Sequence, residues 1–450
     1  MLEGLSNKAL FEKIHSDYFP YYRSWCHDFP IVVSTKRDRE LERLHGILYR
    51  ACEFYVYHYR DYLNIIPYSD KVLEILDYSS RFPFRAGTFR PDFIIDKNGK
   101  ILLCEITSRF FANGYFMSYF MERVGSDIAF ASGLTDYRSY FDAFFDYMAD
   151  MCQGDSDEGI NKLLVLKSED KSDSIKLYVP FYQALGLQVN IIEAGKVEEN
   201  IDLFKDSMIV SALNQQDLLS LSIDTLKKLA ENGMRNDFRT IFLLHDKRMF
   251  NLFFRDDFTS RFLDQEQTRF LRDHVIRTAI PRVTGQNNDG QVQSNDVELN
   301  KDVIMWEDAK KNKDRYILKH HCLGKSEQVY AGPLTDQVEW ESLFESGKVN
   351  EMILQPFIEQ RIYTSTWKGC GMKGKTTPNE EIYPVCESDG YSGYTLREYV
   401  SPSILCVDDK YFGCGLFRTS SCAVINQGDA HKMAPLLTDE IDKLGECNIL

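Results

Sequence analysis

Residues 316–332 read YILKHHCLGKSEQVYAG. An apolar run leads to Lys319, a short turn carries Gly324 and Lys325, and a second apolar run follows. This pattern predicts a strand–glycine–strand hairpin tipped with cations. Such a hairpin suits a phosphate chain, because backbone N–H groups and lysine ammonium groups together offset its charge. An edge hairpin with a solvated lysine tip explains the same stretch, so the rest of the chain has to decide.

Composition limits the classes of function. The 450 residues include 53 basic and 68 acidic residues, for a formal net charge of −15, and 44% are hydrophobic. We therefore expect a sizeable core and two or three domains. The acidic excess disfavours a nucleic acid or an anionic membrane as the main partner. The charged opening lacks the apolar stretch of a signal peptide, and no run is long enough for a membrane helix, so a cytoplasmic protein is expected.

Eleven cysteines are scattered along the chain without a CxxC pair. Several lie inside apolar runs, where a thiol behaves as a small hydrophobe. We expect reduced structural thiols, and the cysteine spacing predicts no zinc site.

Hydrophobic periodicity predicts a mixed α/β chain. Residues 1–152 start with helices, most clearly over 40–63, and continue with two strands joined at the turn 96–99, Asp-Lys-Asn-Gly. Residues 153–240 alternate apolar runs with a helix, which is typical of an α/β substrate-binding domain. The predicted strands are KLLVLKSED (162–170), LQVNIIEAG (187–195), SMIVSAL (207–213) and, just beyond, TIFLLHDK (240–247), and the helix is IKLYVPFYQALG (175–186).

Residues 241–450 form the third predicted part. A long helical stretch covers 246–276 and is capped by Asp246. Strands and hairpins follow, interrupted by polar loops at 284–296 and 368–393.

The stretch CEITSRFFANG, residues 104–114, offers oxygen ligands. A strand here would turn Glu105 and Thr107 to one face, opposite their apolar neighbours. A carboxylate two residues from a hydroxyl can hold Mg²⁺, which prefers oxygen ligands. Arg90 on the facing strand is well placed for a carboxylate or a phosphate. An ordinary Glu–Arg ion pair across the strands explains the same residues.

The stretch MILQPFIEQ, residues 352–360, predicts an apolar strand that ends in a proline-containing turn. A strand whose backbone is partly unpaired can hydrogen-bond an adenine edge, and proline removes one donor there. An ordinary buried strand remains the alternative.

The order of these features along the chain resembles the eukaryotic-type glutathione synthetases and the glutathionylspermidine synthetases, whose ATP-grasp domain is circularly permuted. The likeness covers nearly the whole chain, and its specificity lies in order and spacing. The segments that carry it are Arg90-Pro91-Asp92, Glu105-Ile106-Thr107, the α/β unit, Lys319 to Tyr330, Met352 to Ile358, Glu398 in LREYV, and Arg418 in GLFRTSS followed by AVINQGD.

The resemblance implies an α/β (α+β), ATP-grasp-like, circularly permuted fold with an inserted α/β substrate-binding domain and a helical N-terminal part. It also implies ATP and Mg²⁺ as cofactors. It assigns ATP binding to Lys319, Lys325, Gln328, Tyr330, Gln355, Phe357, Ile358 and Glu398 (which competes in the alignment with Arg397), metal binding to Glu105 and Thr107, and the reacting carboxylate or transferred phosphate to Arg90 and Arg418.

Three positions depart from the family pattern. Thr107 stands where the family has Asn and is a poorer metal ligand. Leu323 falls where the family has a metal-binding Glu, and Lys325-Ser326 replaces a run of glycines. A cation could substitute for part of a metal's role here.

The implied reaction is ADP-forming carboxylate–amine ligation through an acyl phosphate, making an amide or peptide bond on an amino acid or small peptide. A degenerate, non-catalytic binder of nucleotide or peptide is the main alternative, and a small-molecule kinase or a purely structural α/β protein are others. The expected partners are a small carboxylate and a small amine. Their identity would depend on residues 155–235, 284–300 and 370–395, which carry no readable signature. The oligomeric state is open, a homodimer included.

Overall fold

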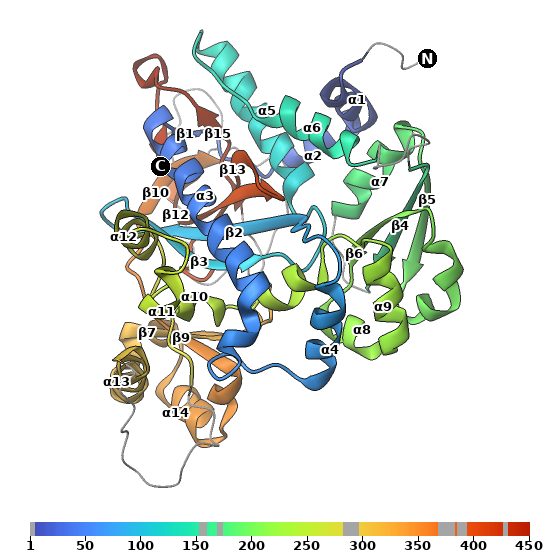
Figure 1. Ribbon diagram of the computed structural model, residues 1–450. Coiled ribbons are helices and arrows are strands. Elements are labelled where there is room, and N and C mark those ends of the chain that lie inside the picture. The colour runs from blue at the N-terminus through green and yellow to red at the C-terminus, as the bar shows by residue number, and fades with distance from the viewer. Residues whose placement is uncertain are drawn as a thin grey trace, which may run out of the picture.

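The computed structural model shows helices packed around four β-sheets (Figure 1). It describes residues 5–152, 160–168, 174–281, 297–367, 383–384, 394–425 and 431–450, to which the statements below refer. The strands are β1 (Ile31–Val33), β2 (Thr88–Ile95), β3 (Ile101–Thr107), β4 (Lys162–Lys167), β5 (Gln188–Glu193), β6 (Met208–Ala212), β7 (Tyr316–His320), β8 (Val329–Ala331), β9 (Met352–Pro356), β10 (Ile362–Trp367), β11 (Tyr383–Pro384), β12 (Tyr394–Val407), β13 (Lys410–Ser420), β14 (His431–Lys432), β15 (Pro435–Leu437) and β16 (Asn448–Ile449). The α-helices are α1 (Asn7–Ile14), α2 (Phe19–Arg23), α3 (Thr35–His58), α4 (Asp70–Ser79), α5 (Tyr115–Ala131), α6 (Phe141–Asp150), α7 (Ser174–Ala184), α8 (Gln215–Ser220), α9 (Ile223–Glu231), α10 (Met249–Leu252), α11 (Asp256–Thr259), α12 (Gln265–Asp273), α13 (Val297–Lys311) and α14 (Gln337–Glu345).

The helical N-terminal part is confirmed, and α3 is its longest helix. The Ser34 hydroxyl begins α3 by accepting a hydrogen bond from the Arg37 backbone N–H at 3.2 Å. Leu41, Leu44 and Leu48, at spacings of three and four residues, are fully buried on one face of the helix. This face packs on the largest sheet, in front of which α3 runs diagonally (Figure 1).

The largest sheet has the strand order β14-β13-β12-β2-β3, and β10 and β11 also pair with β12. Strands β2 and β3 form the predicted hairpin. Asp96 accepts hydrogen bonds from the backbone N–H groups of Asn98 and Lys100, each at 2.8 Å. Gly99 turns the chain at a φ of +84°, where a glycine is favoured.

The α/β unit is a parallel sheet with the order β5-β4-β6. Side chains alternate across it: Leu164 and Leu166 face the core that includes α3, whereas Leu163 and Val165 face aromatic residues of α5, α6 and α7. The predicted strands β4, β5 and β6 and the helix α7 are confirmed. The division of the chain into three domains stays a prediction.

Three secondary-structure predictions are wrong. The stretch after residue 276 is predicted as strands and hairpins, but it also contains the helices α13 and α14. Thr240–Leu244 forms a buried helical turn instead of a strand, because an apolar run that is buried on all sides does not distinguish the two. The single helix predicted over 246–276 is instead three short helices, α10, α11 and α12. Asp264 starts the last of them through a capping box with Gln267, which interrupts the run.

The small sheet has the order β8-β7-β9, with all pairings antiparallel. Helices α13 and α14 cover one face through Trp306, Trp340 and Leu318. Residues 275–279 join the small sheet to the large one, because Val275 bridges to Leu103 of β3 and Ala279 to Leu354 of β9. The two sheets are therefore linked through their edge strands β3 and β9, with the small sheet below the large one in Figure 1.

The nine cysteines within the described ranges are all free thiols, as predicted. Across the same residues, no helix combines the length and the apolar character needed to cross a membrane. The predicted loop at 284–296 and most of the one at 368–393 lie outside the described residues.

Candidate functional site

A cavity lies where the small sheet faces the large one. Its volume is about 100 Å³, below the roughly 300–1,000 Å³ of most small-molecule sites. The hairpin of β7 and β8 closes it from one side. From the large sheet and its neighbours the lining residues are Asp92, Ile94, Cys104, Glu105, Ile276, Ser401, Arg418, Ala423, Val424 and Ile425; from the small sheet they are Ile317, Lys319, Leu323, Gly324, Ser326, Val329, Gln355, Pro356, Phe357, Ile358 and Gln360.

Six of the residues predicted from the sequence meet in this cavity. They come from segments that are up to 313 positions apart, Glu105 and Arg418 being the extremes (418 − 105 = 313). Strand register explains two of the placements: β7 pairs Lys319 with Val329 and Ile317 with Gln355, so these side chains share the cavity face. The six are Glu105, Lys319, Gln355, Phe357, Ile358 and Arg418.

On the second half of the hairpin, the two residues predicted to bind ATP do not face the cavity. Val329 lines the cavity, so its neighbours Gln328 and Tyr330 do not. The Tyr330 ring packs toward α13 and α14, and its hydroxyl accepts a hydrogen bond from Lys348 Nζ at 2.8 Å. Lys325 is exposed on the turn and does not line the cavity either.

Several cavity-lining groups lack a partner among the described residues. The Lys319 side chain is half-buried and makes no hydrogen bond or ion pair there, although its charge acts on the nearby Glu105 carboxylate. The buried Nε of Arg418 is likewise unpaired, as are the buried side-chain oxygens of Gln355 and Gln360. The cavity thus offers one cationic donor from each sheet and two amide acceptors, so it suits a ligand with both an anionic and a donor-bearing part.

Asp92 organises the floor of the cavity and was missed as a site residue, although its Arg-Pro-Asp motif was recognised. Its oxygens accept hydrogen bonds from Arg90 Nε (2.8 Å), Ser403 Oγ (2.5 Å), Thr107 Oγ1 (3.1 Å) and Arg418 Nη2 (3.2 Å). Burial would raise the pKa of Asp92, but the charges of Arg90 and Arg418 outweigh it and hold that pKa well below its usual range.

Arg90 therefore does not line the cavity but contacts Asp92, which does. It is 4% exposed, and besides Asp92 its guanidinium donates to the Asn113 carbonyl at 2.8 Å. The structure places its charge behind Asp92, whereas Arg418 reaches the cavity wall. Of the two arginines predicted to face the reacting groups, only Arg418 lines the cavity.

Lys247 is a second residue that the sequence did not reveal. Its ammonium lies 3.5 Å from Glu105 Oε2 and donates to the Leu323 carbonyl at 2.6 Å, and its side chain is 2% exposed. Burial would raise the pKa of Glu105, but the charges of Lys247 and Lys319 lower it. Its place three residues after the apolar run 240–244 was the only sequence signal.

The predicted pair Glu105 and Thr107 does not fit a magnesium site. The Thr107 hydroxyl donates to Asp92, and the Leu323 carbonyl already accepts from Lys247. Of the two carboxylates that line the cavity, Asp92 is already engaged by protein donors, and a fixed ammonium stands beside Glu105. Thr107 and Leu323 are the positions that differ from the family's metal ligands. The Lys247 ammonium lies at the place where those ligands were expected to hold a metal.

Glu398 lies away from the cavity, so the structure does not bring it together with the other predicted ATP residues. It is 2% exposed, and its oxygens lie 2.8 Å from His27 Nε2 and 2.8 Å from His431 Nδ1. Burial would raise the pKa of Glu398, but both histidines lower it. Its position on β12 next to β10 makes it part of the sheet's interior.

The turn of the hairpin is strained and anchored. Lys325, Ser326 and Gln328 all have positive φ angles, +55°, +59° and +50°, which non-glycine residues rarely adopt. The Ser326 hydroxyl donates to the Ile425 carbonyl at 3.3 Å. Gly324 lies so close to Arg109 that a Cβ there would be 3.0 Å from its guanidinium.

The fold has a known counterpart. One solved structure, described as a glutathione synthetase-like effector (GSS30) from Globodera pallida in the apo form, is similar over 97% of this chain and 98% of that chain. The TM-score is 0.51 and the sequence identity is 12%. The protein thus shares the overall fold of this glutathione synthetase-like effector. At this identity the likeness concerns the fold alone.

A family model described as the AnkG N-terminal domain matches residues 44–243. This stretch includes β2 and β3, with Asp92 and Glu105, but ends before the hairpin that carries Lys319. No curated protein matches the chain.

Proposed function

We propose that the cavity binds ATP and that the protein is an ATP-dependent carboxylate–amine ligase on a circularly permuted ATP-grasp scaffold. The observation that carries the proposal is Lys319: a half-buried cation on a glycine-containing hairpin, facing a cavity, with no hydrogen-bond or ion-pair partner among the described residues. Such a cation, placed between two sheets, is suited to an anionic ligand such as a phosphate chain.

The adenine would lie toward the end of β9. Phe357 and Ile358 line that part of the wall together with the apolar Ile94 and Ile317. The unpaired side-chain oxygens of Gln355 and Gln360 can accept from the exocyclic amine of the base. Apolar walls with a few placed polar groups are the usual composition of a nucleotide pocket.

The phosphate chain would run from there toward Lys319. Lys247 and Arg418 also contribute positive charge where the terminal phosphate would meet a substrate carboxylate. Transfer of the γ-phosphoryl group to the carboxylate gives an acyl phosphate and ADP. An amine then attacks the carbonyl carbon, phosphate leaves, and an amide remains. Cations fixed in advance stabilise the charge that spreads over the phosphoryl oxygens.

The hairpin would have to move outward to admit ATP, since the present cavity is too small for it. The anchors of its turn, at Ser326 and at Leu323, are single hydrogen bonds that can be exchanged for contacts to the nucleotide, whereas the base of the hairpin stays fixed through His321. Closure over the phosphates would keep water from the acyl phosphate.

The test is phosphate release from ATP in the presence of pools of amino acids, short peptides and polyamines. Lys319→Met is the inactive comparison. Lys348→Met is the matched control, because Lys348 lies beside the same small sheet but contacts Tyr330 on the outer side. Release that needs both a carboxylate and an amine, and that is lost only in Lys319→Met, is expected. Release with a single substrate would instead identify a kinase.

A second function is favoured by one observation. The ammonium of Lys247 sits between Glu105 and the Leu323 carbonyl, where the metal ligands were expected. A protein that binds nucleotide without turning it over would show this arrangement. ATP binding that depends on Lys319, with no phosphate release from any pool, would select this alternative over the ligase.

A further inference from the structure

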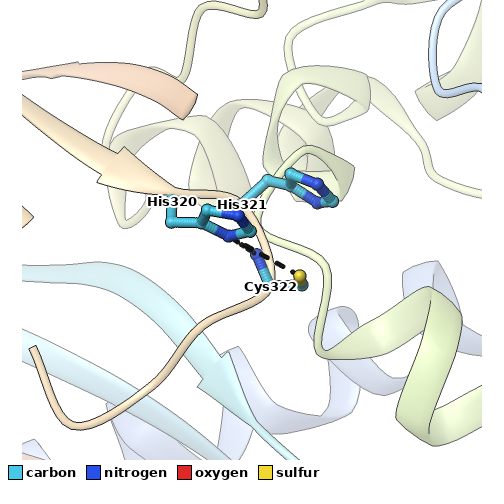
Figure 2. A group of neighbouring side chains, drawn as sticks. All are labelled: His320, His321 and Cys322. Carbon is cyan, nitrogen blue, oxygen red and sulfur yellow. Dashed lines mark hydrogen bonds between the residues drawn. The ribbon is translucent and has the colours of Figure 1, made fainter. Parts of the chain in front are cut away.

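A separate cluster lies at the end of β7, outside the cavity. His320, His321 and Cys322 are consecutive, and Figure 2 shows their side chains gathered at the point where the strand enters the turn. One ligand atom from each lies within 4.8 Å of the others. The two imidazole rings stack with centroids 4.9 Å apart and planes 16° apart.

The backbone holds this cluster in place before any ligand binds. The His321 N–H donates to the Glu351 carbonyl at 3.1 Å, and its carbonyl accepts from the Lys247 N–H at 2.8 Å. The three residues therefore sit on a strand end fixed to two other segments. Rigid supporting elements of this kind are what a metal site needs to keep its ligands in position.

The spacing between the sulfur and nitrogen ligands fits a tetrahedral metal. Cys322 Sγ lies 3.6 Å from His320 Nδ1, as the dashed line in Figure 2 marks. Two ligands bound to zinc at about 2.3 Å (sulfur) and about 2.05 Å (nitrogen), in tetrahedral directions, are also about 3.6 Å apart.

A carboxylate stands beside the cluster. Asp246, which is 2% exposed, places Oδ2 3.3 Å from His321 Nδ1, while both of its oxygens also accept from Arg248. Carboxylates next to histidine ligands either complete the coordination or orient the ring. Glu351 Oε2 lies 3.8 Å from His320 Nε2 on the other side.

Access and chemistry are compatible with metal entry. The side chains of His320 and His321 are 12% and 23% exposed. Without a metal, His320 Nδ1 accepts a hydrogen bond from the Cys322 backbone N–H at 3.2 Å. A metal would take that lone pair in place of this long bond.

We propose that His320, His321 and Cys322, with Asp246 beside them, form a site for a borderline-soft divalent cation of the zinc class. One thiol and two imidazoles are the ligand types that such an ion prefers. Binding forms a metal–sulfur bond and releases the Cys322 thiol proton to solvent. The bound ion would tie the base of the hairpin, one residue from Lys319, to the segment that carries Lys247. The site does not depend on the proposed nucleotide chemistry.

The test is titration of the reduced, full-length protein with Zn²⁺ against a chromophoric chelator, without nucleotide. Co²⁺ binding, followed by absorption, reports whether sulfur is a ligand. We expect one high-affinity ion per chain, a thiolate-to-cobalt charge-transfer band, and an affinity loss of at least about 100-fold in Cys322→Ser, since even residues behind the ligands cost about 10–100-fold. Cys447→Ser is the matched control, being a partly exposed thiol elsewhere.

A second variant, His321→Asn, separates ligand loss from misfolding, with the circular dichroism spectrum as the check on folding. It should lose zinc affinity while keeping the wild-type spectrum. Zinc affinity that is unchanged in both Cys322→Ser and His321→Asn would overturn the proposal. So would a cobalt complex without a sulfur band, or no binding of either ion.

Discussion

The two walls of the cavity are held in different ways. On the large sheet, the Asp92 carboxylate accepts five hydrogen bonds, two of them from Arg90 and one from Arg418, so its charge is fully engaged within this wall. On the small sheet, Lys319 has no hydrogen-bond or ion-pair partner among the described residues and sits at the base of a turn with three strained residues. The large-sheet wall is therefore fixed by its own contacts, whereas the Lys319 side chain on the small-sheet wall is able to contact a ligand.

The largest effect on stability should come from removing the charge of Asp92 at the floor of the cavity. Asp92→Asn leaves Arg90 and Arg418 without their buried counter-charge, so the free energy of unfolding should fall by about 3–5 kcal/mol. Urea denaturation measures this change. Asp409→Asn is the control, because that exposed carboxylate forms an ion pair with Lys410 in solvent and its loss should cost less than about 1 kcal/mol. Equal losses in the two variants would mean that the network has no special weight.

The same wall should respond to alkaline pH through Lys432, which pairs with Arg418 in the sheet register. Burial, and then the Arg418 charge, lower the pKa of Lys432 to about 7. Above pH 7 the unfolded chain keeps a proton on this lysine that the folded chain has lost. Stability should therefore rise by about 1.4 kcal/mol per pH unit from pH 7 toward about 10 through this group.

The measurement is the difference in unfolding free energy between the wild type and Lys432→Met at pH 7, 8 and 9. The difference should shift with pH in the direction given, because other titrating groups cancel between the two proteins. A difference that is constant with pH would show that Lys432 titrates alike in both states.

A smaller effect is expected from the built-in cation. Lys247→Met removes the ammonium beside Glu105, and loss of one charge-assisted contact should weaken ATP binding about 10-fold. It also frees Glu105, so ATP affinity should become more dependent on Mg²⁺ than in the wild type. Calorimetric titration with and without Mg²⁺ checks both points, with Lys348→Met as control. Identical Mg²⁺ dependence in the variant and the wild type would count against Lys247 as a substitute for a metal.

The smallest effect should come from relaxing the hairpin turn. Ser326→Gly removes a side chain from a φ of +59°, which should stabilise the turn by about 1 kcal/mol. Part of this gain is offset by the lost hydrogen bond to Ile425, and Lys325→Gly, at a φ of +55°, tests the turn at a second position. Thermal unfolding should show a higher midpoint for Lys325→Gly. A lower midpoint would mean that the turn is not strained in solution.

Local patterns predicted the fold well. The Asp96 turn, the β7–β8 hairpin and the strands of the α/β unit were readable because each depends on neighbouring residues. The face of a strand was harder to predict. Gln328 and Tyr330 were predicted to bind the nucleotide, but the residue between them, Val329, lines the cavity instead. The apolar run at Thr240–Leu244 shows no alternation of apolar and polar residues, so its sequence could not distinguish a helix from a strand.

The site was only partly predictable, because its key contacts join distant segments. Lys247 meets Glu105 across 142 positions (247 − 105) and Leu323 across 76. Glu398 is fixed by His27, which lies 371 positions away. Neither pairing leaves a local pattern. The family resemblance alone assigned Glu398 to the nucleotide, and no sequence pattern pointed to Lys247.

The most direct test of the central claim is calorimetric titration of ATP into the wild type and into Lys319→Met. We expect ATP to bind the wild type, and to bind the variant about 10–100-fold more weakly, because the variant loses a charge-assisted contact to phosphate. Lys348→Met should bind as the wild type does. No binding of ATP to the wild type, or equal affinity in Lys319→Met, would contradict the assignment of this cavity to a nucleotide.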